Sequence, residues 1–258
     1  MPATLLLLLF WAFSGVRELS TVRIPGLDEA SGMAASRLHP GLYWLHNDSG
    51  EGKIPEIFGI GSDGKLKAKV RITGAEMRDW ESMAAGPGGK LYIGDIGDNY
   101  RRNPQIHIYR FNEPRLTAKS VKAEKMSIRY PDGPRDAEAL LVHPVTGDLY
   151  IISKSDASPR VYRAKWGDKV FRKVGELSIR SFLGITGADI SPDGKRVVLC
   201  DYFRGYEAEF DEQWNQEWVT FDLGRRRQGE AVTYRLDGRA IVAASEGAAF
   251  PLIQVERY

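Results

Sequence analysis

The sequence predicts an all-β fold, a five-bladed β-propeller closed by an N-terminal strand. A pattern of two apolar strands around a Pro/Gly turn recurs along the chain at roughly 45–55 residues, a period typical of a four-stranded propeller blade. Apolar and polar residues alternate within these segments, and turn residues recur at roughly 8–12 residues, as in antiparallel sheets. No long stretch has the competing 3.6-residue period of an amphipathic helix.

Five copies of the repeat align. They are SGMAASRLHPGLYWLHNDSG from Ser31, WESMAAGPGGKLYIGDIGDN from Trp80, AEALLVHPVTGDLYIISKSD from Ala137, GADISPDGKRVVLCDY from Gly187 and GEAVTYRLDGRAIVAASEG from Gly229. Third strands such as 106–111, 160–164 and 252–258 follow the copies, and more polar outer strands are expected at 68–72, 124–130 and 218–223. Each copy therefore predicts one blade.

The fifth copy is one strand short, because the chain stops after its third strand. The segment TVRIP (21–25) has no place in the first blade. An N-terminal strand that completes the last blade removes two exposed sheet edges, so we expect residues 21–25 to close the ring. Residues 20–258 then form a single propeller domain.

Residues 1–19 are expected to be a signal peptide. The apolar run Leu5–Phe13 is too short to cross a bilayer as a helix, which needs roughly 20 residues, and Ala12-Phe13-Ser14 is similar to a cleavage site. The start, MPAT, has no Lys or Arg, so a membrane tether or a misassigned start is the alternative. We expect a secreted or periplasmic protein with no stable membrane span after cleavage.

Composition excludes several classes of function. A single cysteine and four histidines cannot supply a Cys-based zinc site or histidine-rich metal chemistry. The net charge of +2, from 36 basic and 34 acidic residues, gives no reason to expect nucleic acid as a partner. A small anionic ligand or a protein partner remains open, and we expect a monomer.

Alignment of the first strands brings oxygen-bearing residues into one column. The column contains Ser31, Glu81, Glu138, Thr186 and Glu230. The first strand of a blade is innermost, so this column predicts a ring of oxygen ligands at one mouth of the central channel. Three carboxylates in one ring repel each other and need protons, cationic side chains or a metal. Mixed oxygen donors suit a hard cation such as calcium, which we predict as the cofactor.

The loops between second and third strands open on the same mouth and are polar. They include 47–50, 95–99 and 153–156, and the last two copies contribute Asp201 and Ser245-Glu246. We assign Asp48 and Asp201 to ligand binding. Asp95 and Asp98, with Glu138, are the candidates for catalysis. Short Asp/Asn/Gly loops are also good turns, which is the alternative for each loop by itself.

Arginine lies three residues before the ring glutamate in three copies: Arg78, Arg135 and Arg227. One hypothesis is an anion-binding site, since guanidinium groups bind phosphate or carboxylate through two donors. The other hypothesis is that these arginines neutralise the neighbouring acidic residues. The two roles are compatible.

The ring order Ser31, Glu81, Glu138, Thr186 and Glu230 is similar to that of the calcium-activated apyrases, and EASGM (29–33) resembles the start of their first blade. This resemblance implies a secreted five-bladed propeller with calcium on the axis that hydrolyses nucleoside di- and triphosphates. The strings DWESMA, YIGDIGDN and RQGEAV resemble a group of exported bacterial propellers of unknown function. A looser likeness connects the chain to gluconolactonase and phytase-like propellers.

Three functional hypotheses follow. The first is a calcium-containing propeller whose metal is mainly structural and whose mouth binds a ligand. The second is a metal-dependent hydrolase of a phosphorylated or lactone substrate, in which the metal activates water and an Asp acts as base. The third is a platform for protein partners. A propeller fold by itself does not choose among them.

Overall fold

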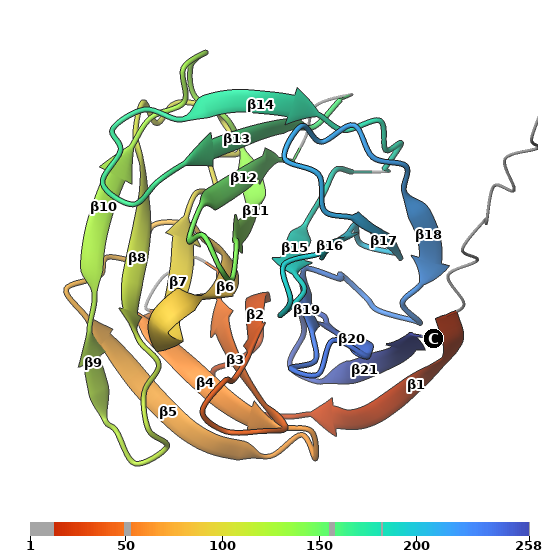
Figure 1. Cartoon of the computed structure of the whole chain (residues 1–258). Coiled ribbons are helices and arrows are strands. Elements are labelled where there is room, and N and C mark those ends of the chain that lie inside the picture. Colours follow the sequence, from red (N-terminus) through yellow and green to blue (C-terminus); the bar gives the residue numbers. More distant parts are fainter. Residues whose placement is uncertain (1–12, 49–52, 155–157, 182, 258) are drawn as a thin grey trace, which may run out of the picture.

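The computed structural model describes residues 13–48, 53–154, 158–181 and 183–257. Over these residues the chain forms five sheets arranged radially around a central axis (Figure 1). The predicted five-bladed β-propeller is confirmed. The short 3-10 helix η1 (Pro87–Gly89) is the only helical element in the described part of the chain.

Each sheet is one blade, and in blades 1 to 4 the strands follow one another in sequence from the axis outwards. Blade 1 contains β2 (Ala30–Ala35), β3 (Leu42–Asn47), β4 (Glu56–Gly61) and β5 (Leu66–Thr73). Blade 2 contains β6 (Trp80–Gly86), β7 (Lys90–Asp95), β8 (Ile106–Asn112) and β10 (Glu124–Ile128). Blade 3 contains β11 (Ala137–Val142), β12 (Leu149–Ser153), β13 (Arg160–Ala164) and β14 (Arg172–Glu176). Blade 4 contains β15 (Gly187–Ile190), β16 (Arg196–Cys200), β17 (Arg204–Glu209) and β18 (Val219–Asp222).

Blade 5 is built from both ends of the described chain. It contains β19 (Ala231–Tyr234), β20 (Ala240–Ala244), β21 (Phe250–Arg257) and, on the outside, β1 (Phe13–Val22). Blade 1 also has an additional outer strand, β9 (Ser120–Lys122), which runs parallel to β5. The excursion between the third and outer strands of blade 2 supplies β9, so it ties blades 1 and 2 together.

The closing strand lies earlier in the chain than the sequence predicts. Strand β1 pairs antiparallel with β21 from Phe13 opposite Arg257 to Val22 opposite Phe250, instead of at 21–25. Residues 13–19, which the sequence assigns to the leader, lie in this strand. Its outermost place in the blade explains the difference, because a strand covered on one side carries few apolar residues. The rest of the predicted leader, up to Ala12, lies outside the described residues.

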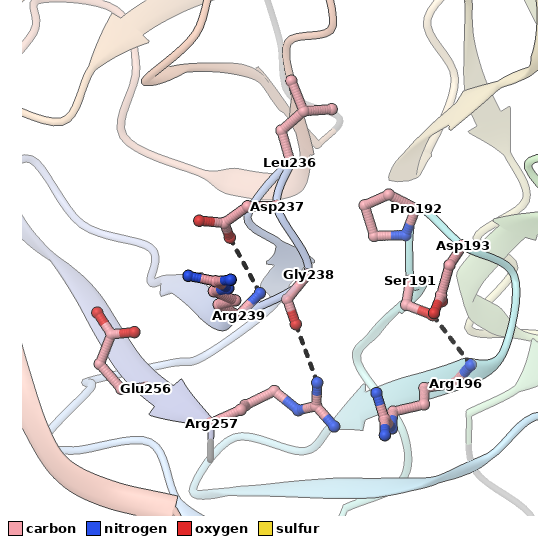
Figure 2. Close-up of a pocket in the computed structure, with 10 residues that line it drawn as sticks. All are labelled: Ser191, Pro192, Asp193, Arg196, Leu236, Asp237, Gly238, Arg239, Glu256 and Arg257. Atoms are coloured by element: carbon pink, nitrogen blue, oxygen red, sulfur yellow. Dashed lines mark hydrogen bonds between the residues drawn. The ribbon is translucent and has the colours of Figure 1, made fainter.

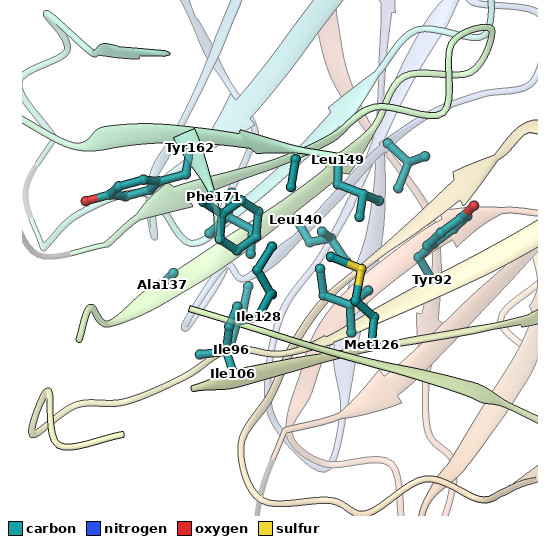
Figure 3. Close-up of a cluster of buried hydrophobic side chains, with 14 of the residues drawn as sticks. Tyr92, Ile96, Ile106, Met126, Ile128, Ala137, Leu140, Leu149, Tyr162 and Phe171 are labelled. Carbon is teal, nitrogen blue, oxygen red and sulfur yellow. The ribbon is translucent and has the colours of Figure 1, made fainter. Parts of the chain in front are cut away.

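Hydrophobic clusters join neighbouring blades around the whole ring. Figure 3 shows one of them, in which Ile106 and Met126 of blade 2 pack with Leu140 and Tyr162 of blade 3. Four further clusters join blades 3 and 4, 5 and 1, 1 and 2, and 4 and 5. Burial of each large apolar side chain contributes about 1.5–3 kcal/mol to folding, so these interfaces hold the ring closed.

The innermost strands contact one another in cyclic order, β2, β6, β11, β15, β19 and back to β2. Their first residues therefore meet at one end of the axis, where the site described below lies. Among the described residues, no helix has the length and apolar character needed to cross a membrane.

Candidate metal centre

The predicted ring residues lie at the starts of the innermost strands. Ser31, Glu81 and Glu138 lie in β2, β6 and β11, while Thr186 and Glu230 directly precede β15 and β19. All five are buried, with exposed fractions between 0% for Ser31 and 5% for Glu81. The structure thus gathers the five oxygen-bearing side chains in the interior, at one end of the axis. Their role as metal ligands remains a prediction.

Local irregularity in the first three blades coincides with these residues. The pairing register shifts between Ala30 and Gly32, so Ser31 is the extra residue, and it shifts at Glu138 in the same way. In blade 2 the shift follows Glu81, at Ser82, whose φ is 68°. A β-bulge re-aims side chains at the end of a strand. The bulges therefore change the direction of the ring side chains from the one that regular strand alternation would give them.

Glu81 is the ring carboxylate with the most acidic surroundings. Its Oε2 accepts a hydrogen bond from the Ser31 hydroxyl. Burial raises the pKa of Glu81 well above its ordinary value, and the charges of Glu138 and Glu230 raise it further. Three carboxylates close together in a buried site favour the binding of a proton or a cation.

Asp48 and Asp79 lie beside Glu81. One carboxylate oxygen from each of the three residues lies within 4.8 Å of the others. Asp48 comes from the loop after β3, and Asp79 lies in the bend just before β6, two residues before Glu81. This acidic cluster can hold a metal ion.

Glu138 has a different neighbour. The Lys154 ammonium pairs with Glu138 Oε1 and also donates a hydrogen bond of 3.1 Å to the Tyr202 hydroxyl. Glu138 Oε2 is buried and has no hydrogen-bond partner among the described residues. Burial raises the pKa of Glu138 to about 8, although the Lys154 charge opposes this rise. The sequence gives Lys154 no such role, since a lysine after a strand is typical of a solvated loop.

The other two ring residues both bond to the segment that precedes β19. Gln228 Nε2 donates to Glu230 Oε1 at 2.9 Å, and the Thr186 hydroxyl donates to the Gly229 carbonyl at 2.7 Å. Burial, a hydrogen bond with Glu230 and the charges of nearby carboxylates together raise the pKa of Glu246 to about 9. Glu246 thus adds a further carboxyl group beside Glu230.

The other predicted acidic residues organise the loops. Asp95 Oδ1 accepts from the Asp79 backbone at 2.8 Å, and Asp98 Oδ2 accepts from the Asn103 backbone at 2.8 Å. Asp201 Oδ2 accepts from the Tyr206 hydroxyl at 2.6 Å. These contacts are those of turn formation. The catalytic role of Asp95 and Asp98 and the ligand-binding role of Asp201 are predictions that the contacts do not address.

Loop residues 49–50 and 155–156, which the sequence adds to the polar rim, lie outside the described residues.

Two of the three predicted arginines bond away from the ring. Arg78 Nη2 donates to the carbonyls of Asp95 and Gly97, each at 3.1 Å. Arg135 pairs with Asp132 at 3.1 Å and donates to the Tyr162 hydroxyl at 3.2 Å.

Arg227 is exposed. Its neighbour Arg226 is buried and donates to the Asp201 carbonyl at 3.2 Å. Arg78 and Arg135 therefore contact loop groups, and within the described residues neither pairs with a ring glutamate.

A separate groove of about 840 Å³ lies at the opposite ends of the inner strands, between the turns 191–193 of blade 4 and 236–239 of blade 5 (Figure 2). Its floor includes Arg257, which pairs with buried Glu207 at 2.6 Å and donates to the Gly238 carbonyl at 2.9 Å. These internal contacts account for Arg257 structurally. We therefore take the acidic ring as the candidate functional site.

Fold and site together define a five-bladed β-propeller with an acidic cluster that can hold a metal ion. No protein-family model and no curated protein matches the chain. Among solved structures, the chain is similar to hydrazine synthase of Kuenenia stuttgartiensis, with a TM-score of 0.49 and 16% sequence identity. That match covers 86% of this chain and 57% of the hydrazine synthase chain. The propeller assignment rests on the five sheets themselves.

Proposed function

We propose that this protein is a calcium-binding β-propeller whose cation stabilises the mouth of the central channel. The observation that carries the proposal is the convergence of Asp48, Asp79 and Glu81, whose oxygens lie within 4.8 Å of one another. Carboxylate and hydroxyl oxygens are hard donors, and calcium accepts six to eight of them in flexible geometry. The donor set therefore suits calcium better than zinc, which prefers nitrogen and sulfur.

A further observation supports a cation in this position. Burial raises the pKa of Glu81, and the charges of neighbouring carboxylates, Asp48 among them, raise it too. A divalent cation would neutralise these charges and connect segments from blades 1 and 2, so its main effect is on stability.

An exported location fits this proposal. Extracellular calcium modules have dissociation constants of about 10⁻⁴–10⁻³ M, matched to the calcium available outside the cytoplasm. The apolar run at the start of the chain is the reason to expect export.

Calcium titration of EDTA-treated protein tests the proposal. At calcium concentrations well above the dissociation constant, the melting temperature should rise, because a ligand that binds only the folded state stabilises it. Isothermal titration should give saturable binding that Glu81→Gln removes. No heat of binding and no shift in melting temperature up to about 10 mM calcium, far above the affinity of such modules, would overturn the proposal.

A further inference from the structure

Lys154 is an ammonium group built into the acidic ring. It follows β12, whose last residue, Ser153, lies opposite Ala137 in β11, so Lys154 lies opposite Asp136, two residues before Glu138. The exposed fractions of the two side chains are 15% for Lys154 and 5% for Glu138. The ion pair is therefore largely withdrawn from solvent, where screening is weak and charges interact strongly.

Several contacts fix Lys154 in this place. Its backbone NH donates to the Asp136 carbonyl at 3.0 Å, and its Nζ donates to the Tyr202 hydroxyl at 3.1 Å. Gly184, whose φ is 89°, packs so closely on the Lys154 carbonyl that a Cβ would overlap it. Holding a lysine side chain in one rotamer costs conformational entropy, up to about 2 kcal/mol. Here Asp136 and Gly184 hold the Lys154 backbone, while Glu138 and Tyr202 hold its ammonium group.

We propose that Lys154 is an internal competitor for the cation. Its ammonium group neutralises the Glu138 side of the ring and confines a divalent cation to Asp48, Asp79 and Glu81. The proposal rests on the proposed calcium function and specifies where in the ring the cation lies. A divalent cation next to Glu138 would face the Lys154 ammonium, and like charges in a partly buried site repel strongly. The cation therefore binds off the propeller axis, and Lys154 limits its affinity.

The test compares calcium binding by the wild type, Lys154→Met and Lys53→Met. Methionine keeps the length of the lysine stem and removes its charge. Lys53 is the matched control, because its salt bridges are to Asp28 and to Glu29, the latter at 3.3 Å, and not to a ring glutamate. We expect Lys154→Met to bind calcium about tenfold more tightly or better, and Lys53→Met to change the affinity by less than about threefold.

Stability without calcium gives a second readout. Lys154→Met leaves Glu138 as a buried carboxylate without its counter-ion, so the melting temperature in EDTA should fall and calcium should raise it by more than in the wild type. Lys154→Gln, which keeps a hydrogen-bond donor, replaces Lys154→Met if the latter does not fold.

The outcomes separate the two proposals. If neither the wild type nor the Lys154 variants bind calcium, the calcium function itself is wrong. If the wild type binds calcium and the Lys154 variants bind it equally well or more weakly, the competition is wrong and the calcium function stands. An equal gain in Lys53→Met would show a general charge effect of the mouth and would also overturn the role of Lys154.

Discussion

The two sides of the axial ring start from equivalent positions and differ in charge. Glu81 and Glu138 begin the innermost strands of neighbouring blades, beside a bulge in each case. Glu81 lies with the carboxylates of Asp48 and Asp79, whereas Glu138 pairs with Lys154. The repeat therefore sets the position of each carboxylate, and the loops between strands decide whether it meets an acid or a base. On the calcium proposal, this difference places the cation on one side of the ring.

Replacement of the two glutamates should affect calcium binding most, and unequally. Glu81→Gln removes a charged ligand and should weaken calcium binding by about 100-fold or more, whereas Glu138→Gln should weaken it by less than about tenfold. Isothermal titration measures both affinities. Glu113→Gln is the control, since Glu113 is a buried carboxylate that accepts from Trp44 Nε1 at 2.9 Å, outside the ring. Equal losses in Glu81→Gln and Glu138→Gln would instead indicate a cation on the axis.

Close packing on the Glu81 side predicts a large loss of stability in Gly32→Ala. A Cβ at Gly32 would overlap the His46 ring and lie 2.7 Å from the Met83 nitrogen and 2.8 Å from the Ser82 carbonyl carbon. Such overpacking should lower the free energy of unfolding by about 3 kcal/mol, measured by urea denaturation. Gly15→Ala is the control, because a Cβ there meets nothing within 4 Å. If Gly32→Ala is as stable as the wild type, β2 and β6 can move apart enough to accommodate the extra methyl group.

The raised carboxyl pKa values predict that stability depends on pH and that calcium changes this dependence. Glu138 and Glu246 have pKa values raised from 4.5 to about 8 and about 9, so they favour the folded state while protonated. Their contribution is complete below about pH 4.5 and is lost as the pH rises through 8 and 9. In EDTA the melting temperature should therefore fall between pH 5 and pH 9, roughly the interval of these titrations.

Calcium should reduce this fall, because it stabilises the charged carboxylates. The measurement is a series of thermal melts across this pH range with and without calcium. Melting temperatures that rise with pH in EDTA would contradict the raised pKa values.

The smallest effect is expected for Arg135→Ala. Arg135 contacts Asp132 and Tyr162, away from the ring, so calcium affinity should stay within about twofold of the wild type. Isothermal titration under the same conditions checks this. A marked change would mean that the upstream arginines act on the ring after all.

The sequence was sufficient to predict the blades, because alternation and turn spacing are local properties. The closing strand was predicted too late in the chain, because this outer strand lacks a strong apolar pattern. Val16, for example, is 37% exposed. The apolar run before it also favoured a leader up to residue 19. Pairing with β21, at the far end of the chain, is what makes Phe13–Val22 a strand.

At the site, the column of ring residues could be aligned, but its charge partners could not. The arginines precede the glutamates in loop segments outside the strands, where spacing along the chain does not fix the direction of a side chain. Asp79 also lies in a bend, and its place beside Glu81 is a result of the fold. Lys154 reaches Glu138 only through the pairing register of β11 and β12, so spacing along the chain gives little sign of it.

Anomalous diffraction from crystals grown with calcium would locate the cation. We expect one peak at roughly 2.3–2.6 Å from oxygens of Asp48, Asp79 and Glu81, with Lys154 still paired to Glu138. A peak on the axis, shared by Glu81, Glu138 and Glu230 with Lys154 displaced, would contradict this expectation, as would the absence of any peak at the ring.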